Sequence, residues 1–322
     1  MQINTIIAFS SFLLTIVASL IIIPILKKIK IGQIERTDGP QSHLKKQGTP
    51  TMGGIIFILA IIICTIGCYF YQNSTNVLNS VLIILLTTGF GIVGFIDDFK
   101  KLVLKNTKGL KPSYKMIGLF LISTVYTLFI IRLSRYGTDL IIPIIKKEIT
   151  LPIILYIPFA MFVMLGTTNA VNLTDGIDGL ATSVSSIIIA CLTVIAIINS
   201  VDEIVILGII VVGSLLGFLI FNLHPARIFM GDTGSLFLGG LISAVALYLK
   251  VPLILIIIAI IPIIETLSVM IQVSYYKKTG NRIFKMAPIH HHFELSGWNE
   301  NKIVRVFSVI TLIACVLGIV SI

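Results

Sequence analysis

The stretch VLIILLTTGFGIVGFIDDFKK, residues 81–101, is an apolar run that ends abruptly in two aspartates and two lysines. A bilayer core about 30 Å thick requires about 20 predominantly apolar residues of helix. The run therefore predicts a membrane-spanning helix with its core at 79–96. Its charged end, Asp97 and Asp98 followed by Lys100 and Lys101, is expected at the membrane surface.

The same length criterion finds spans along the whole chain. The candidate cores are 3–26, 53–71, 79–96, 116–131, 152–171, 179–199, 203–221, 233–249, 251–275 and 303–322. Prolines lie in the fifth and ninth cores, and we expect Pro262 to bend the ninth. The sequence therefore predicts an all-α integral membrane protein, one domain over 1–322, with about ten transmembrane helices.

The composition agrees with this class. Hydrophobic residues make up 56% of the 322 and charged residues only 12%, about half the charged fraction of soluble domains. The formal net charge of +10 does not indicate nucleic-acid binding, because the charges lie in short loops between apolar runs. The first run lacks a basic region before it and is too long for a signal peptide, so we expect it to remain as a helix.

The basic residues are unequally divided between alternate loops. One set of loops holds 19 of the 24 lysines and arginines and the other holds 5. Because cytoplasmic loops carry the basic excess, both termini are expected outside the cell. This orientation places a set of aspartates and histidines together on the cytoplasmic face, and their common location predicts an active site built from cytoplasmic loops. They are Asp97, Asp98, Asp175, Asp178, Asp232, His290, His291 and His292.

The adjacent aspartates at 97 and 98 are expected to close the third helix. Acidic groups oppose the dipole at a helix C-terminus, so a cation or proton should compensate them. Adjacent helical side chains diverge by about 100°, which predicts different roles for the two carboxylates. The alternative is a solvated pair neutralised by the following lysines.

The segment NAVNLTDGIDGLA, residues 169–181, places Asp175 and Asp178 three residues apart among glycines. This spacing can put both carboxylates on one face, where they suit a sugar, a nucleobase edge or Mg²⁺. An N-cap and turn before the next helix would explain residues 174–179 equally well.

The segment NLHPARIFMGDTGSLFLGG, residues 222–240, precedes the eighth expected helix. Asp232, Thr233 and Ser235 can cap that helix, and its free N–H groups are suited to phosphate. Phe229 in the loop suits stacking on a base, with an interfacial anchor as the alternative. A purely capping role for the polar residues also stays open.

Three successive histidines, His290 to His292, lie in KMAPIHHHFELSGW, residues 285–298. Their spacing is not that of a zinc site, so we interpret them as phosphate contacts and structural hydrogen bonds before metal ligands. Glu265 lies inside the ninth span, where an ionisable group is functional by default. Its partner cannot be named from the sequence, and a proton relay or a structural hydrogen bond would each use it.

Taken together, these motifs resemble the phospho-N-acetylmuramoyl-pentapeptide transferase family of polyprenyl-phosphate N-acetylhexosamine-1-phosphate transferases. The resemblance covers nearly the whole chain and rests on segments in the family's order: KKQGTPTMGG, GFIDDFKK, KNTKGLKPSYK, NLTDGIDGLA, NLHPARIFMGDTGSLFLGG and APIHHHFE.

The resemblance implies a ten-helix homodimer in the bacterial cytoplasmic membrane that depends on Mg²⁺. Its substrates would be UDP-MurNAc-pentapeptide and undecaprenyl phosphate, and its products undecaprenyl-diphospho-MurNAc-pentapeptide and UMP. Asp97, Asp98 and Asp232 would be the catalytic carboxylates, with Asp232 the Mg²⁺ ligand and the three histidines completing the site. Substrate binding would fall to Lys46, Lys101, Asn172, Asp175, Asp178, Asn222 and Phe229.

The mechanism and two rival functions stay open at this point. The lipid phosphate can attack directly, with Asp98 accepting its proton, or an aspartate can form a covalent phospho-sugar intermediate, and we favour direct attack. A GlcNAc-1-phosphate transferase would share the acidic motifs, although APIHHHFE favours the muramoyl enzyme. An ion-coupled transporter is the other rival, and we find no internal repeat to support it.

Overall fold

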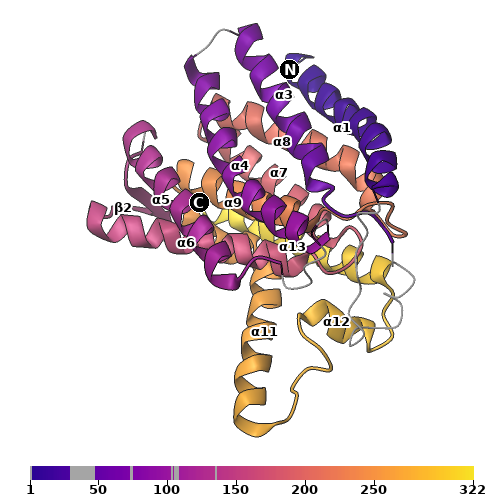
Figure 1. Ribbon diagram of the computed structural model, residues 1–322. Coiled ribbons are helices and arrows are strands. Elements are labelled where there is room, and N and C mark those ends of the chain that lie inside the picture. Colours follow the sequence, from indigo (N-terminus) through magenta and orange to yellow (C-terminus); the bar gives the residue numbers. More distant parts are fainter. Residues whose placement is uncertain (1, 30–47, 73–74, 103, 105–108, 135) are drawn as a thin grey trace.

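The computed structural model describes all residues except 1, 30–47, 73–74, 103, 105–108 and 135 (Figure 1). Within the described residues, nine helices are long and apolar enough to cross a membrane. They are α1 (Gln2–Lys28), α3 (Gly54–Gln72), α4 (Thr75–Leu102), α5 (Pro112–Leu133), α6 (Ile153–Thr174), α7 (Leu180–Ile198), α8 (Asp202–Asn222), α9 (Gly231–Tyr248) and α13 (Glu300–Val320). The predicted all-α membrane class is confirmed.

The tenth predicted span, 251–275, is broken. A 3-10 turn η1 (Pro252–Ile254) and α10 (Leu255–Ile258) meet α11 (Ile260–Thr279) at an angle of 78°. Counting this bent pair as one span gives the predicted ten, and the expected bend is confirmed. In Figure 1, α11 projects away from the other helices, with the short helix α12 (Ile289–Glu294) beside it.

Helix α9 forms the centre of the bundle. In its most apolar stretch 89% of the residues are buried, against 22% for α1 at the periphery. It packs mainly against α4 and α6. The approach of α4 to α9 depends on Gly94, because a Cβ there would lie 2.1 Å from the backbone oxygen of Asp232. This contact brings Asp97 and Asp98, one turn further along α4, to the start of α9.

One end of the bundle gathers the segments predicted to lie outside the cell. Strands β1 (Asp139–Ile142) and β2 (Lys147–Thr150) pair antiparallel in a hairpin, with Asp139 opposite Thr150. The backbone N–H of Ile141 donates to Lys250 O, and that of Ile144 donates to Ser321 O. The hairpin, the loop after α9 and the C-terminus are therefore neighbours, as expected of segments on one membrane face.

The predicted end of the third span at Asp97 and Asp98 is wrong, because α4 continues to Leu102. Lys100 and Lys101 occupy its last turn, where cations complement the helix dipole. Lys101 also pairs with Asp97 four residues earlier, which supports the extra turn. The two aspartates thus lie inside a helix.

A candidate active site at one end of the bundle

Two aspartates and two lysines form a compact charged cluster beside the start of α9. Lys101 Nζ lies 2.7 Å from Asp97 Oδ2 and 3.0 Å from Asp232 Oδ2. Lys115 Nζ, from α5, lies 3.0 Å from Asp232 Oδ2 and 3.7 Å from Asp97 Oδ2. Each ammonium group therefore stands between two carboxylates that belong to different helices. The space between Asp97 and Asp232 is one that a cation fits.

Asp98 faces another way, as predicted for adjacent helical residues. Its Oδ2 accepts hydrogen bonds from Thr233 N at 2.9 Å and Thr233 Oγ1 at 2.7 Å, and its Oδ1 accepts from Asp232 N at 3.3 Å. Asp98 therefore caps the N-terminus of α9 from a neighbouring helix. The predicted capping of α9 by its own Asp232, Thr233 and Ser235 is wrong, because Asp232 and Ser235 use their side chains elsewhere.

Asn172, near the end of α6, fixes the other side of Asp232. Its Nδ2 donates to Asp232 Oδ1 at 2.9 Å and lies 2.8 Å from Ser235 Oγ. Asp232 is thus held through Oδ1 by an amide and through Oδ2 by two ammonium groups. Three helices besides its own determine where this carboxylate points.

Asp175 lies in the turn between α6 and α7, outside both spans. Desolvation by the surrounding protein and, to a smaller extent, the negative charges of Asp232, Asp98 and Asp178 together raise the pKa of Asp175 to about 8. The side chain keeps partial solvent exposure. Asp175 thus belongs electrostatically to the carboxylate cluster.

Asp178, three residues later, is buried and joined to two other segments. Its Oδ2 lies 2.9 Å from His224 Nδ1 and accepts a hydrogen bond from Ala226 N at 3.0 Å. Its backbone N–H donates to Glu300 Oε2 at 3.0 Å. The alternative interpretation of residues 174–179 is observed as far as the backbone goes, because a turn follows α6 and ends at Gly179, the N-cap of α7, although no side chain caps that helix.

Asn222 and Phe229 lie at the two sides of the loop before α9. Asn222 is buried: its Oδ1 accepts from Thr182 Oγ1 at 2.6 Å and its Nδ2 donates to Ile228 O at 2.9 Å. Phe229 is half-buried, and its backbone N–H donates to Pro50 O while its carbonyl accepts from Gly53 N. The loop is thereby joined to the TPTMGG segment before α3.

The three histidines point to three different partners. His290 is fully buried, with Nδ1 3.1 Å from Oε2 of Glu265, which identifies the partner that the sequence could not. His291 Nδ1 lies 2.7 Å from Glu294 Oε2. His292 Nδ1 accepts a hydrogen bond from Lys285 N at 3.2 Å. Structural hydrogen bonding, one of the two predicted roles, is observed for His292.

Within the part of the chain that the structure describes, two groups of side chains offer ligands for a metal ion. The carboxylates of Asp97 and Asp232 offer the oxygen ligands that Mg²⁺ prefers, at a spacing now bridged by ammonium groups. A second group, with one ligand atom each from Asp178, His224 and Glu300 within 4.8 Å of one another, mixes nitrogen and oxygen. Its mixed donor set is less typical of Mg²⁺.

Sequence reasoning missed Lys115, His224 and Glu300 as neighbours of the site. Lys115 could have been identified from the sequence, because this residue ends the quoted segment KNTKGLKPSYK and is one of the basic residues on the same face. His224 could have been identified in the same way, because it lies in the quoted segment NLHPARIFMGDTGSLFLGG, whereas Glu300 lies in none of the quoted segments and approaches Asp178 only through a long-range contact. Lys46, predicted to bind substrate, lies outside the described residues.

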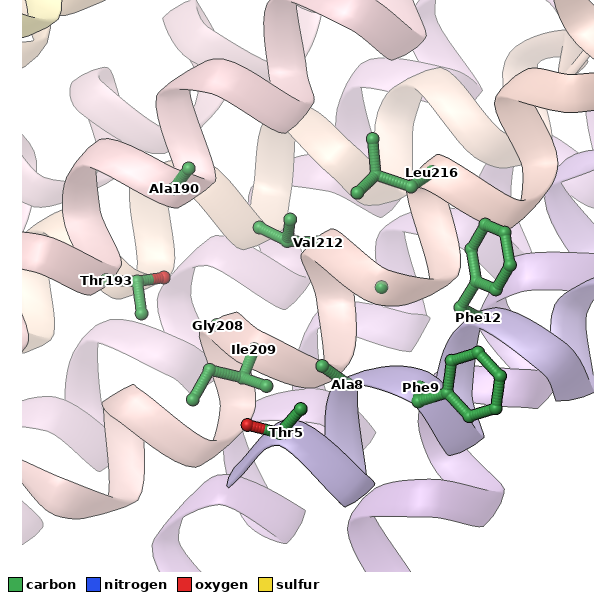
Figure 2. Close-up of a pocket in the computed structure, with 11 residues that line it drawn as sticks. Thr5, Ala8, Phe9, Phe12, Ala190, Thr193, Gly208, Ile209, Val212 and Leu216 are labelled. Carbon is green, nitrogen blue, oxygen red and sulfur yellow. The ribbon is translucent and has the colours of Figure 1, made fainter. Parts of the chain in front are cut away.

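An apolar groove lies elsewhere, among α1, α7 and α8 (Figure 2). It has a volume of about 440 Å³ and is lined by residues such as Phe9, Phe12, Thr193, Ile209 and Leu216. Its walls belong to membrane-spanning helices, and none of the predicted site residues lines it. We therefore do not associate it with the chemistry of the charged cluster.

A bundle of membrane-spanning helices with carboxylates, lysines and a helix N-terminus at one end defines an enzyme class that handles anionic substrates. Comparison with known families agrees. The model of glycosyl transferase family 4 matches residues 80–250. The phospho-N-acetylmuramoyl-pentapeptide-transferase signature 1 matches residues 46–58.

Similar proteins cover nearly the full chain. A phospho-N-acetylmuramoyl-pentapeptide-transferase of Clostridium perfringens (strain SM101 / Type A) is 50% identical over 97% of this chain and 94% of its own length. Proteins of that name from Clostridium novyi (strain NT) and Acetivibrio thermocellus are each 46% identical, over 97% and 96% of this chain and 94% and 92% of their own. The chain belongs to the phospho-N-acetylmuramoyl-pentapeptide-transferase family within glycosyl transferase family 4.

Proposed function

We propose that this chain transfers phospho-MurNAc-pentapeptide from UDP-MurNAc-pentapeptide to undecaprenyl phosphate. The products are undecaprenyl-diphospho-MurNAc-pentapeptide and UMP, and the reaction is the first membrane step of peptidoglycan synthesis. The observation that carries the proposal is the cluster of Asp97, Lys101, Lys115 and Asp232 at the start of α9. The names of relatives at 46–50% identity support the muramoyl substrate over the GlcNAc-1-phosphate alternative.

The chemistry requires two anions to react with each other. An oxygen of the lipid phosphate forms a bond to the β-phosphorus, and the bond from that phosphorus to the bridging oxygen breaks, so that UMP leaves with the oxygen. Charge repulsion and positioning limit such a transfer. Lys101 and Lys115 supply two positive charges beside the place of reaction, and their aspartate partners hold them there until the diphosphate arrives.

Asp97 and Asp232 are proposed to hold Mg²⁺, which would supply further positive charge to the phosphate oxygens. Two carboxylate oxygens that approach one ammonium group at 2.7 and 3.0 Å can also approach a divalent cation. Asn172 and Asp98 would orient Asp232 for this task, one through its amide and the other through the cap on α9.

We retain direct attack over a covalent aspartyl intermediate, because a lipid phosphate near lysines is already largely anionic. Asp98 already accepts three hydrogen bonds from the start of α9, which leaves about one acceptor position of its carboxylate for a proton. We therefore assign Asp98 first to positioning Asp232. The acceptor role remains a prediction.

The remaining predicted residues are proposed to bind the nucleotide or to support those that do. Asp175 faces the cluster and is the proposed nucleotide contact of its turn. Asp178 and Asn222 hold the surrounding loops through their own hydrogen bonds, and Phe229 would stack on the base. Lys46, His291 and His292 would complete the phosphate surroundings, and the fully buried His290 would support the site without touching substrate. A homodimer in the bacterial cytoplasmic membrane, with both termini outside, is proposed with this function.

Purified protein in detergent should be mixed with Mg²⁺, undecaprenyl phosphate and UDP-MurNAc-pentapeptide, and UMP release should be measured. We expect stoichiometric UMP and lipid product. Turnover only with UDP-GlcNAc would instead identify the related transferase. No UMP from either donor, together with ion uptake into proteoliposomes, would identify a transporter.

A further inference from the structure

Glu265 and His290 form a buried pair whose role the proposed chemistry leaves open. Neither residue has exposed surface, and His290 Nδ1 lies 3.1 Å from Glu265 Oε2. The backbone N–H of His290 points to the same oxygen at 3.5 Å. Glu265 belongs to α11 and His290 to the first turn of α12, so the pair joins these two helices. Burying two ionisable side chains is costly, which calls for a compensating role.

The far edge of the imidazole ring packs directly on the turn between α6 and α7. A Cβ built on Gly176 would lie 2.1 Å from His290 Nε2 and 2.5 Å from Cε1. The ring therefore occupies the space that any side chain at position 176 would need. Gly176 directly follows Asp175. Glu265 thus reaches the turn that carries Asp175 through a single intervening side chain.

The burial of the ring favours positioning over direct contact with substrate. His290 has no exposed surface, and neither of its ring nitrogens makes a hydrogen bond among the described residues, so its ring contact with Glu265 is the 3.1 Å approach of Nδ1 to Oε2. Asp175, by contrast, keeps partial exposure. The imidazole, packed against Gly176 and without exposed surface, supports the turn and is not open to a ligand. A carboxylate beside one ring nitrogen commonly fixes the orientation of such a ring.

We infer that Glu265 is a positioning residue that, through the imidazole of His290, holds the turn of Asp175 in place for the uridine nucleotide. This inference rests on the proposed function, which assigns Asp175 to that substrate. The proposed function assigns no contact with the lipid phosphate to this turn. A defect at Glu265 is therefore specific for one of the two substrates.

The first test is Glu265→Leu, which removes the acceptor at similar volume. We expect the KM for UDP-MurNAc-pentapeptide to rise by about 10- to 100-fold, as for the loss of a buried contact with a charged group. We expect kcat and the KM for undecaprenyl phosphate to stay within about threefold. Glu265→Gln keeps an oxygen for Nδ1–H and should recover most of the loss. A fall in kcat with both KM values unchanged indicates a merely structural role and overturns the inference.

A double-mutant cycle tests the route through His290. If Glu265 acts through the imidazole, Glu265→Leu combined with His290→Ala should raise the nucleotide KM no further than His290→Ala alone. Losses that multiply contradict the inference. Gly176→Ala should raise the same KM by displacing the ring. Gly166→Ala on α6, where a Cβ meets nothing within 4 Å, is the matched control and should leave it unchanged.

Calorimetric titration with UDP-MurNAc-pentapeptide in the absence of lipid separates this inference from the proposed function. Weaker binding to Glu265→Leu than to the wild type supports positioning even if no lipid product forms. Equal binding, in a wild-type enzyme that releases UMP, overturns positioning and leaves the proposed function intact. A wild type that neither binds this nucleotide nor releases UMP overturns both.

Discussion

The two ends of the helix bundle both contain buried carboxylates, but they stabilise them differently. At the hairpin end, Glu203 Oε1 accepts a hydrogen bond from Tyr248 at 3.0 Å, and the same hydroxyl accepts from Asn79 Nδ2 at 3.1 Å. Nearby, Lys250 pairs with Glu148 at 2.6 Å. At the other end, Asp97 and Asp232 share Lys101 and Lys115.

The two ends differ in how many hydrogen-bond or ion-pair partners are available to each carboxylate. A carboxylate with its own donor gains little from rearrangement, and such a network makes the local structure rigid. Carboxylates that share two ammonium groups have alternative pairings of similar geometry. An arriving diphosphate or cation can therefore replace one partner without leaving the others unpaired. Shared and perturbed charges of this kind are typical of functional sites.

The largest effect is expected from removing a charge at the shared end. Asp232→Asn should lower kcat by about 10³-fold, because it weakens the hold on both lysines and on the proposed metal. Initial rates of UMP release at saturating substrates measure this. A variant with near-normal turnover would show that Asp232 only supports α9.

Glu203→Gln is the matched control at the hairpin end. It should leave kcat unchanged but lower the thermal unfolding midpoint in detergent, because Gln replaces a charged acceptor with a neutral one at the Tyr248 hydroxyl. Loss of turnover in this variant, at full stability, would contradict the division of the bundle into a structural and a catalytic end.

A smaller effect is expected on the pH dependence of stability. The folded-state pKa of Asp175 is raised to about 8 from an ordinary value of 3.8, so the folded state binds the proton more tightly. The stabilisation is complete below the ordinary value and is lost as pH rises through the folded pKa. Asp175→Asn, which cannot ionise, should therefore unfold at a higher temperature than the wild type at pH above about 8.

The two proteins should converge as pH falls toward 4. Thermal unfolding without metal or nucleotide, compared across this range, measures the difference. A difference in unfolding temperature between the two proteins that does not change with pH would show that the carboxyl of Asp175 is not held in its neutral form by its surroundings.

The smallest effect on turnover is expected from single-cysteine variants that test on which side of the membrane each end of the bundle lies. Single cysteines at Asn281 and Ile145, in a background without the four native cysteines, should leave turnover nearly unchanged, since both side chains are exposed. The cysteine at 281 should react with an impermeant reagent only from the cytoplasm, and the one at 145 only from outside. The reverse pattern would place the charged cluster outside the cell.

The sequence was sufficient to predict the spans because the apolar length required by a bilayer is a strong local signal. The helix ends were harder to predict. The third helix was expected to end at Asp97 and Asp98 because the apolar run stops there, yet the pairing of Lys101 with Asp97 supports a further turn and α4 continues.

The candidate site was predictable as a set of residues but not as a set of contacts. The membrane topology placed the aspartates of three loops on one face, and the structure brings Asp97, Asp175 and Asp232 into one electrostatic group. The cap on α9 from Asp98, and the pairing of Glu265 with His290, depend on tertiary packing. Neither is encoded in local spacing, so local reasoning assigned the cap to Asp232, Thr233 and Ser235.

The cap that Asp98 provides for α9 also determines when the site can form during synthesis of the chain. Asp98 is synthesised well before the helix that it caps, since more than a hundred residues separate it from Thr233. Until that later helix is inserted, its carboxylate lacks these backbone and hydroxyl donors, and α9 in turn begins without a cap of its own. The charged cluster thus cannot form until synthesis has passed the start of α9 and this central helix has packed against α4.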